Sequence, residues 1–329
     1  MPDPLVVAVV GPTAAGKSDL SVALCKRLGG EVVNADAMQV YRGMDIGTAK
    51  ISTTERDGVP HHLLDILDVT ETATVAEFQQ LARQAIDDCL DRGKVPVLAG
   101  GSALYIRAIL DDFVFPGTDA TVRARLEAEL AAKGSGALHE KLTEIDPKAA
   151  EQILPSNGRR IVRALEVVEI TGGPYVATLP EHRYVYPGAV QLGLDVPRPE
   201  LDERIGRRVD RMFDAGFADE VRGLLNKGLI EGKTANRALG YSQVIALLNG
   251  EIDEVEARER TAQATRRFAR RQDSWFRKDQ RISWLPYDDP DLLEKALEVI
   301  AEGNRTASSG VVGVEEGPSH QPGAVDARG

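Results

Sequence analysis

Short apolar runs alternate with amphipathic stretches over the first third of the chain. Leu5–Val10, Glu31–Ala35 and Val95–Ala99 are apolar runs of the kind found in strands buried on both faces of a sheet. Between them, Lys17–Leu28 and Thr74–Arg92 repeat apolar residues at helical spacing. This alternation predicts an α/β fold, with a mostly parallel sheet and flanking helices on both of its faces.

The hydrophobic pattern changes between Pro116 and Pro187, where helical spacing continues without a convincing buried strand. Val122–Ala132, which is followed by Gly134, predicts one helix, and Arg159–Thr171 predicts another. We therefore expect an α-helical insertion domain within the α/β core.

The pattern of the core returns after the insertion. Val190–Val196 predicts a strand, Leu201–Ala215 a helix, and Glu251–Leu285, which lacks Gly and Pro, a long helical stretch. From Arg305 the chain is rich in Gly, Ser, Pro and charge, which predicts a disordered tail. The expected organisation is residues 1–115 for the first part of the core, 116–187 for the insertion, 188–304 for the rest of the core and 305–329 for the tail.

Composition narrows the class of protein. The 329 residues are 43% hydrophobic and 28% charged, as in soluble globular proteins, and no apolar run is long enough to span a membrane. Two cysteines and no signal-peptide pattern favour a reduced, cytoplasmic location. The net charge of −11 argues against a protein that coats nucleic acid nonspecifically, although a local basic surface remains possible.

A phosphate-binding loop follows the first predicted strand. The sequence GPTAAGKS has the Walker A spacing and lies between a strand and a helix, which is the context that this motif requires. Its glycines let backbone N–H groups converge on phosphate oxygens, Lys17 adds a positive charge, and the Ser18 hydroxyl is a candidate ligand for Mg²⁺. The predicted phosphate contacts are Gly11, Pro12, Thr13, Ala14, Ala15, Gly16, Lys17 and Ser18.

Asp36 follows the second predicted strand, at the sheet edge where ligands of open α/β sheets bind. A carboxylate at this edge could hold Mg²⁺ through water or accept a proton from a nucleophile. It could equally cap the next turn. Position alone leaves these interpretations open.

Longer motifs resemble the tRNA dimethylallyltransferase family, also called tRNA isopentenyltransferases, in its bacterial form. The matching segments run collinearly from about residue 5 to about residue 290: GPTAAGKS, NADAMQVYRGMDIGTAK, PHHLLDI, AGGSALYIRA, GRRIVRALEV, RVDRMFDAGFADEV, RALGYSQV and ATRRFARRQDSWFR. The chain departs from the family in having Ala15 and Ser18 where Ser and Thr are frequent, and ADAMQ where many members have SDSMQ. It also lacks the zinc-finger extension of eukaryotic members.

The resemblance implies transfer of a dimethylallyl group from dimethylallyl pyrophosphate to the N6 amine of the adenosine 3′ of the anticodon, in tRNAs that read codons beginning with U. The phosphate loop would then bind the pyrophosphate of the donor, with Mg²⁺ at Ser18. The resemblance also implies that Asp36 is the general base and that Thr13 contacts the bridging oxygen. Arg208 would bind the leaving group from the opposite side; its helix face also carries Arg204 and Arg211.

The resemblance further implies a tRNA anticodon stem-loop as the partner. The expected tRNA contacts are Asp36, Ala37, Met38, Gln39, Ser102, Arg123, Arg159, Arg160, Arg163, Arg237, Gly240 and Tyr241. A separate basic run at residues 266–281 has the composition of an RNA-binding helix, but also that of an amphipathic helix with solvated arginines. The second interpretation is supported by Trp275 and Phe276, which are expected to pack inside.

Two other functions fit parts of the sequence. The phosphate loop alone favours a kinase for a small molecule or nucleotide, but kinases do not carry the segment 34–50. A non-catalytic RNA-binding protein switched by a nucleotide is the other alternative. A monomer is expected.

Overall fold

The structure, a computed structural model, describes residues 4–175 and 182–309. Within these residues a six-stranded sheet has the order β3-β2-β4-β1-β5-β6, and every neighbouring pair is parallel. This confirms the predicted α/β class. The strands are β1 (Leu5–Val10), β2 (Glu31–Asn34), β3 (His61–His62), β4 (Pro96–Ala99), β5 (Gly188–Asp195) and β6 (Ile282–Pro286).

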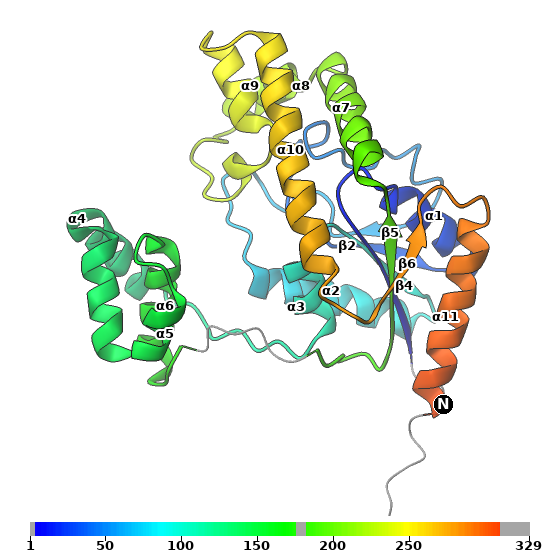
Figure 1. Cartoon of the computed structure of the whole chain (residues 1–329), viewed down its shortest axis with the longest axis horizontal. Helices are drawn as coiled ribbons and strands as arrows, with labels where there is room; N and C mark the ends of the chain where they lie inside the picture. Colours follow the sequence, from blue (N-terminus) through cyan, green and yellow to red (C-terminus); the bar gives the residue numbers. More distant parts are fainter. Residues whose placement is uncertain (1–3, 176–181, 310–329) are drawn as a thin grey trace, which may run out of the picture. The chain divides into compact units, whose positions relative to one another are not determined.

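Helices cover both faces of the sheet (Figure 1). α1 (Lys17–Leu28) and α11 (Leu292–Ser309) lie on one side, and α2 (Val75–Asp91) and α3 (Ala103–Leu110) on the other. The apolar residues that predicted these elements form the core between them. Val7 and Val9 of β1 pack with Leu24 of α1 and Ile300 of α11, and none of these four side chains is more than 3% exposed. Their burial is the main stabilising contribution on this face.

Four further helices follow β5 and lie beside the sheet (Figure 1). They are α7 (Arg198–Asp214), α8 (Phe217–Leu225), α9 (Tyr241–Leu248) and α10 (Glu254–Phe276), with a short 3-10 helix, η1 (Ala235–Arg237), before α9. α7 packs against α10 through Leu201, Ile205 and Ala269, while α8 packs against α9. The pairing of α7 with α10 sets two arginine-bearing helices next to each other.

The predicted helical stretch over Glu251–Leu285 is wrong at its end. α10 stops at Phe276, and Ile282–Pro286 forms β6, which pairs with β5. The expectation that two neighbouring aromatic residues pack inside is correct for Phe276, which is 2% exposed, and wrong for Trp275, which is 46% exposed. Adjacent positions on a helix point about 100° apart, so only one of the two rings faces the core.

Residues 110–185 form a separate compact unit. It contains α4 (Ala120–Ile145), α5 (Pro147–Gln152) and α6 (Gly158–Thr171), which enclose a small core that includes Leu126, Leu142 and Leu165. Within α4 the backbone leaves helical geometry at Gly134, with φ 79° and ψ 168°, at the predicted stop. The unit begins six residues earlier and ends two residues earlier than the predicted insertion of 116–187.

The final helix, α11, continues to Ser309, so the first residues of the predicted 305–329 tail are helical. The remainder of that predicted tail, residues 310–329, lies outside the described residues. No helix in residues 4–175 and 182–309 has the length and apolar character needed to cross a membrane.

Candidate active site

The phosphate loop joins β1 to α1 with backbone conformations that favour glycine. Gly11 has φ 136° and Gly16 has φ 104°, whereas Ala14 takes a left-handed φ of 65° despite its side chain. The Ala14 carbonyl accepts a hydrogen bond of 2.8 Å from Arg204 Nε of α7. The loop is therefore held from outside by an arginine of a distant helix.

Lys17 and Arg208 bring positive charge to the inside of this loop. Lys17 Nζ donates to the Pro12 carbonyl at 2.8 Å. Burial, followed by repulsion from Arg208, lowers the pKa of Lys17 to about 8, while Asp36 opposes this shift. Burial also lowers the pKa of Arg208, again against the attraction of Asp36. These three groups are thus close enough to interact electrostatically.

Asp36 lies just past the end of β2. Its backbone N–H donates to Asn34 Oδ1 at 2.9 Å, and its own Oδ1 accepts from the Met38 N–H at 2.9 Å. Asn34 is fixed in turn because its Nδ2 donates to the Leu63 carbonyl at 3.0 Å. Oδ2 of Asp36 makes no hydrogen bond within the described residues, so the carboxylate caps a turn and keeps one oxygen for a ligand. The capping interpretation of Asp36 is thereby confirmed, whereas its role towards Mg²⁺ or a nucleophile stays a prediction.

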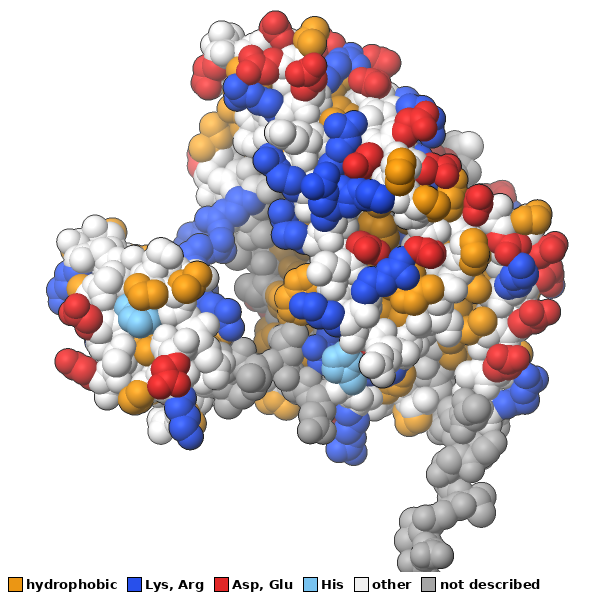
Figure 2. Space-filling model, viewed as in Figure 1, with side chains coloured by type: hydrophobic (Ala, Val, Ile, Leu, Met, Phe, Trp, Pro, Cys, Tyr) orange, Lys and Arg blue, Asp and Glu red, His pale blue; other side chains and the backbone are white. Residues whose placement is uncertain are grey.

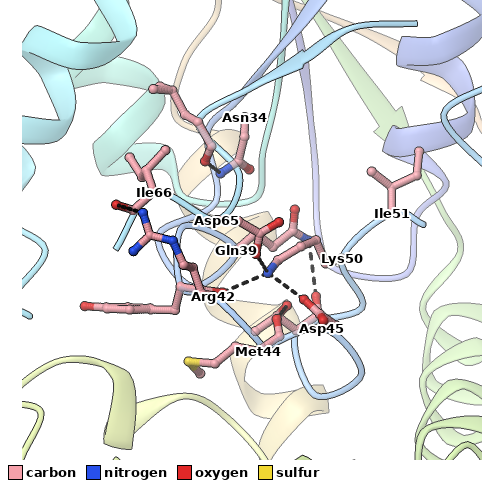
Figure 3. A network of polar contacts seen from close by, with 12 residues as sticks. Asn34, Gln39, Arg42, Met44, Asp45, Lys50, Ile51, Asp65 and Ile66 are labelled. Atoms are coloured by element: carbon pink, nitrogen blue, oxygen red, sulfur yellow. Dashed lines mark hydrogen bonds and ion pairs between the residues drawn. The ribbon is translucent and has the colours of Figure 1, made fainter. Parts of the chain in front are cut away.

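The segment after Asp36 is held by a buried lysine (Figure 3). Lys50 Nζ donates to Asp45 Oδ1 at 2.7 Å, to Asp65 Oδ1 at 2.6 Å and to the Tyr41 carbonyl at 2.8 Å, and its side chain is only 3% exposed. All three donors of the ammonium group are therefore used within the segment. Gln39 adds a contact from its Nε2 to the Thr48 carbonyl at 3.2 Å.

Glu220 of α8 holds the same segment from the other side. Its carboxylate accepts hydrogen bonds from three consecutive backbone N–H groups, those of Asp45 at 2.9 Å, Ile46 at 2.6 Å and Gly47 at 3.0 Å. The Tyr241 hydroxyl donates to it at 2.7 Å. Such charge-assisted bonds are stronger than neutral ones, so Glu220 is a principal anchor of the segment that carries Asp36.

These elements line a cavity of about 1100 Å³. Several residues that were predicted as site residues from the sequence line it: Thr13, Ala14, Gly16, Lys17, Ser18, Asp36, Gln39 and Arg208. Residues without a predicted role line it too, among them Gly101, Arg204, Arg211, Phe268 and Gln272. Gly11, Pro12, Ala15, Ala37, Met38 and Ser102 were predicted as contacts and are not among the lining residues.

Ser18 is suited to a hard divalent cation. Its side chain is exposed at the start of α1, lines the cavity, and makes no hydrogen bond within the described residues. A hydroxyl oxygen beside pyrophosphate oxygens and water is the donor set that Mg²⁺ prefers. The residues present therefore fit this ion.

A second group of potential metal ligands lies outside the residues that line this cavity. Glu31, His62 and Cys89 bring ligand atoms within 4.8 Å of one another. However, Arg92 binds both oxygens of Glu31, at 2.6 and 2.8 Å. The hydrogen bonds of this bidentate pair are the main reason that the pKa of Glu31 is lowered to about 2. The cluster is thus an ion-pair centre that already has its cation.

Two predicted tRNA contacts of the 110–185 unit are engaged with a carboxylate. Arg123 donates to Glu166, and Arg163 donates to Glu166 Oε2 at 2.8 Å and to the Pro116 carbonyl at 2.6 Å. Glu166 is fully buried. Arg159 and Arg160 are exposed. The geometry therefore gives Arg123 and Arg163 a structural role within their own unit, and their contact with tRNA stays a prediction.

The predicted contacts near α9 differ in exposure. Arg237 is exposed, whereas Gly240 is buried and Tyr241 is 0% exposed. Burial raises the pKa of Tyr241, and the negative charge of Glu220 beside the hydroxyl raises it further. Its ring also meets Phe217 edge to face, with centroids 5.1 Å apart. The Tyr241 side chain is thus a core residue, and the contact of Tyr241 with tRNA stays a prediction.

Basic side chains gather over α7 and α10 (Figure 2). Arg207, Arg211, Arg267, Arg270 and Arg271 are exposed on these two helices. Arg207 pairs with Glu203, and Arg270 NH2 lies 4.0 Å from Asp202, but Arg211 and Arg267 make no ion pair within the described residues. Arg271 lies over the Phe268 ring at 5.7 Å. We call these five residues the arginine surface.

Known proteins resemble this chain over most of its length. The family model described as IPP transferase matches residues 39–279. The chain belongs to this family. It is 63% identical over 302 residues to the tRNA dimethylallyltransferase of Thermobifida fusca, covering 90% of this chain and 94% of the relative. It is 66% identical over 300 residues to the protein of the same name from Streptomyces griseus, covering 90% and 96%.

Solved structures extend the comparison of this IPP transferase family member. The full-length tRNA isopentenylpyrophosphate transferase of Bacillus halodurans matches with a TM-score of 0.68 and 42% identity, covering 93% of this chain and 98% of the other. A eukaryotic dimethylallyltransferase described as acting on tRNA matches with a TM-score of 0.81 and 26% identity, covering 93% and 80%. The P-loop-like fold and the family resemblance of the motifs are thereby confirmed.

Sequence reasoning missed Glu220 and Gln272 as parts of the site. Glu220 stands in the matched motif RVDRMFDAGFADEV and Gln272 in ATRRFARRQDSWFR, so their segments were recognised without a role for either residue. Local pattern could not find them, since Gln272 contacts Thr13, 259 positions away.

Proposed function

We propose that this protein transfers a dimethylallyl group from dimethylallyl pyrophosphate to the N6 amine of an adenosine in tRNA. The acceptor is the adenosine 3′ of the anticodon in tRNAs that read codons beginning with U, as its relatives' family implies. The observation that carries the proposal is the arrangement of one cavity. A phosphate loop with Lys17, a carboxylate at Asp36 and a guanidinium at Arg208 line it together.

The chemistry assigns a task to each of these groups. N6 of adenine forms a bond to C1 of the dimethylallyl group while the bond from C1 to the pyrophosphate oxygen breaks, and the electron pair leaves with pyrophosphate. Lys17, Arg208 and the loop N–H groups stabilise the negative charge that develops on the leaving group. Thr13 also lines the cavity, and its task in this proposal is to donate a hydrogen bond to the bridging oxygen. Asp36 orients the amine and accepts the proton that N6 loses.

Mg²⁺ at Ser18 would neutralise part of the pyrophosphate charge. The protein residues do the rest of the work: they bind the two substrates, align the reacting atoms and receive the proton. Alignment matters because an adenine amine is a weak nucleophile, and holding it against the allylic carbon replaces a bimolecular encounter by a positioned one. An adenosine in the anticodon loop must also leave its stack to enter the cavity.

The test is the reaction itself with unmodified tRNA, dimethylallyl pyrophosphate and Mg²⁺. We expect tRNA that is heavier by one dimethylallyl group, with release of pyrophosphate. Asp36→Asn keeps the size and the Met38 hydrogen bond but removes the base, so kcat should fall by about 10² to 10⁴ while tRNA binding persists.

Outcomes of this assay separate the alternatives. ATP-dependent phosphorylation without alkylation of tRNA would favour the kinase and overturn the proposal. Full activity of Asp36→Asn would remove Asp36 from its role as base. The comparisons favour the transferase over the kinase, since the relatives are dimethylallyltransferases.

A further inference from the structure

Gln272 is a buried polar side chain that touches two loops of the cavity at once. It lies on α10 and is 7% exposed. Its Oε1 accepts a hydrogen bond from the Thr13 N–H at 2.9 Å, and its Nε2 donates to the Gly101 carbonyl at 2.7 Å. Thr13 belongs to the phosphate loop after β1, and Gly101 to the turn after β4. One amide therefore bridges the ends of two neighbouring strands.

The two contacts require an amide in one orientation. A backbone N–H can only donate and a carbonyl can only accept, so Oε1 must face Thr13 and Nε2 must face Gly101. A carboxylate of similar size would place an acceptor oxygen, instead of a donor, opposite the Gly101 carbonyl. An apolar side chain would leave two buried backbone groups without partners, which is costly.

Gly101 provides the space for this contact. A Cβ added at position 101 would lie 2.3 Å from Gln272 Nε2, closer than real atoms approach. Gly100, one residue earlier, lies against the next strand in the same manner, since its Cβ would be 2.5 Å from the Ala35 carbonyl, just before Asp36. The β4 turn is thus fitted between Gln272 on one side and the Asp36 strand end on the other.

We propose that Gln272 is a positioning residue for prenyl transfer. Its amide holds the phosphate loop, at Thr13, in a fixed position relative to the turn after β4. The inference rests on the proposed function. Gln272 holds the Thr13 N–H, while the Thr13 hydroxyl makes no hydrogen bond within the described residues and is available to the substrate. The amide therefore fixes the donor's leaving group relative to the turn packed beside Asp36. It touches no reacting atom.

The first experiment replaces the amide and measures kcat and KM for each substrate. Gln272→Ala should lower kcat by about tenfold or more, the size of effect that follows from losing a buried hydrogen bond. KM for dimethylallyl pyrophosphate should rise, and KM for tRNA should change less, because the arginine surface is intact. Gln263→Ala is the matched control, since Gln263 is an exposed residue of the same helix, and it should match the wild type.

The isosteric variant Gln272→Glu gives a signature that a merely structural role would not. When protonated, its carboxyl group can donate to the Gly101 carbonyl and accept from Thr13, whereas the ionised form cannot donate. Its activity relative to the wild type should therefore rise as the pH falls from about 8 to about 6, as expected for a buried carboxyl group that is held protonated. A constant ratio over this range would count against the proposal. This variant also carries the test if Gln272→Ala does not fold.

Gly101→Ala displaces the amide without changing it. It should reproduce the kinetic defect of Gln272→Ala, and the double variant should be no worse than either single one, because both remove the same contact. Additive defects, or unchanged kcat and KM in variants that merely melt at lower temperature, would overturn the proposal. A wild type that does not alkylate tRNA would instead overturn the proposed function, so the two failures are distinguishable.

Discussion

Each cation around the phosphate loop has a different set of neighbours, and these neighbours decide what it can do. Arg204 is occupied by the Ala14 carbonyl and lies 4.8 Å from the Tyr287 ring centroid, so it holds the loop. Lys17 is tethered only by the Pro12 carbonyl. Arg208, one turn after Arg204, forms no hydrogen bond or ion pair in the part of the chain that the structure describes. Lys17 and Arg208 therefore keep donors for a ligand, and both line the cavity together with Asp36.

The lowered pKa of Lys17 predicts a pH dependence at this residue. Below about pH 8 the ammonium group is charged and binds pyrophosphate; as the pH rises through that value, the free enzyme loses the proton. KM for dimethylallyl pyrophosphate should therefore rise above about pH 8, approaching tenfold per pH unit for a single essential proton. Steady-state kinetics between pH 6.5 and about 9.5 measures this limb.

Lys17→Met provides the comparison for this limb. It should bind the donor weakly at every pH and lose the dependence near pH 8. The same shift has a consequence for folding: the unfolded chain, with the ordinary pKa of 10.5, binds more protons than the folded one between about pH 8 and 10.5. The contribution of Lys17 to stability therefore increases as the pH rises through this window.

For the kinetics, an alkaline limb in Lys17→Met that is identical to that of the wild type would assign this limb to another group.

At the scale of elements, the segment from Asp36 to Asp65 has little regular structure of its own. Its order comes from two charged side chains that saturate their hydrogen bonds: the buried Lys50 from within the segment and the half-buried Glu220 from α8. Gly47 closes the contact, because a Cβ there would lie 2.3 Å from the Phe217 ring. Helix α8 thus supports a loop that is 173 positions away in sequence.

Glu220→Gln tests this support. The amide offers one acceptor oxygen where the carboxylate has two, and its NH₂ group would face backbone donors, so at least one N–H of residues 45–47 loses its partner. We expect a loss of about 1 to 3 kcal/mol in the free energy of unfolding. KM for tRNA should rise, because the predicted base contacts Asp36–Gln39 lie on this segment. Chemical denaturation and steady-state kinetics measure the two effects.

Asp219→Asn is the matched control for this variant. Asp219 is the preceding residue of α8, its side chain is 79% exposed, and it pairs only with Arg222. Surface pairs of this kind contribute little, so both stability and kinetics should stay close to the wild type. A Glu220→Gln enzyme with unchanged stability and unchanged KM for tRNA would show that Lys50 alone holds the segment.

The same elements show which parts of the fold and of the site could be predicted from the sequence. Leu5–Val10 and Lys17–Leu28 were predicted with their observed bounds, because burial on both faces and a glycine stop act locally. β6 was missed since Ile282–Pro286 becomes a strand only by pairing with β5, about 90 residues earlier. Asp36 was located by its place after a strand. Its supports, Glu220 and Gln272, depend on distant partners, and the motif match gave their segments but not their contacts.

At the scale of the whole molecule, an acidic protein must attract an acidic substrate. The net charge is −11, which repels a polyanion at long range. The arginine surface offsets this locally, and its charges are only partly neutralised by Glu203 and Asp202. Salt screens interactions beyond about 8 to 10 Å, so close contacts between arginines and phosphates outweigh the distant acidic residues. We therefore expect tRNA to follow α7 and α10 toward the cavity.

The salt dependence of tRNA binding tests this path. Each arginine that contacts a phosphate adds about 0.7 to 0.9 to the slope of log K against log salt. The double variant Arg267→Gln and Arg271→Gln should therefore reduce the slope by about 1.5, weaken tRNA binding and leave KM for dimethylallyl pyrophosphate unchanged. Arg260→Gln is the control, because Arg260 lies on the same helix and pairs with Glu256. An unchanged slope in an enzyme that still alkylates tRNA would contradict this path and place the phosphate contacts outside the arginine surface. This conclusion covers Arg207 and Arg211 as well, since they belong to the same surface.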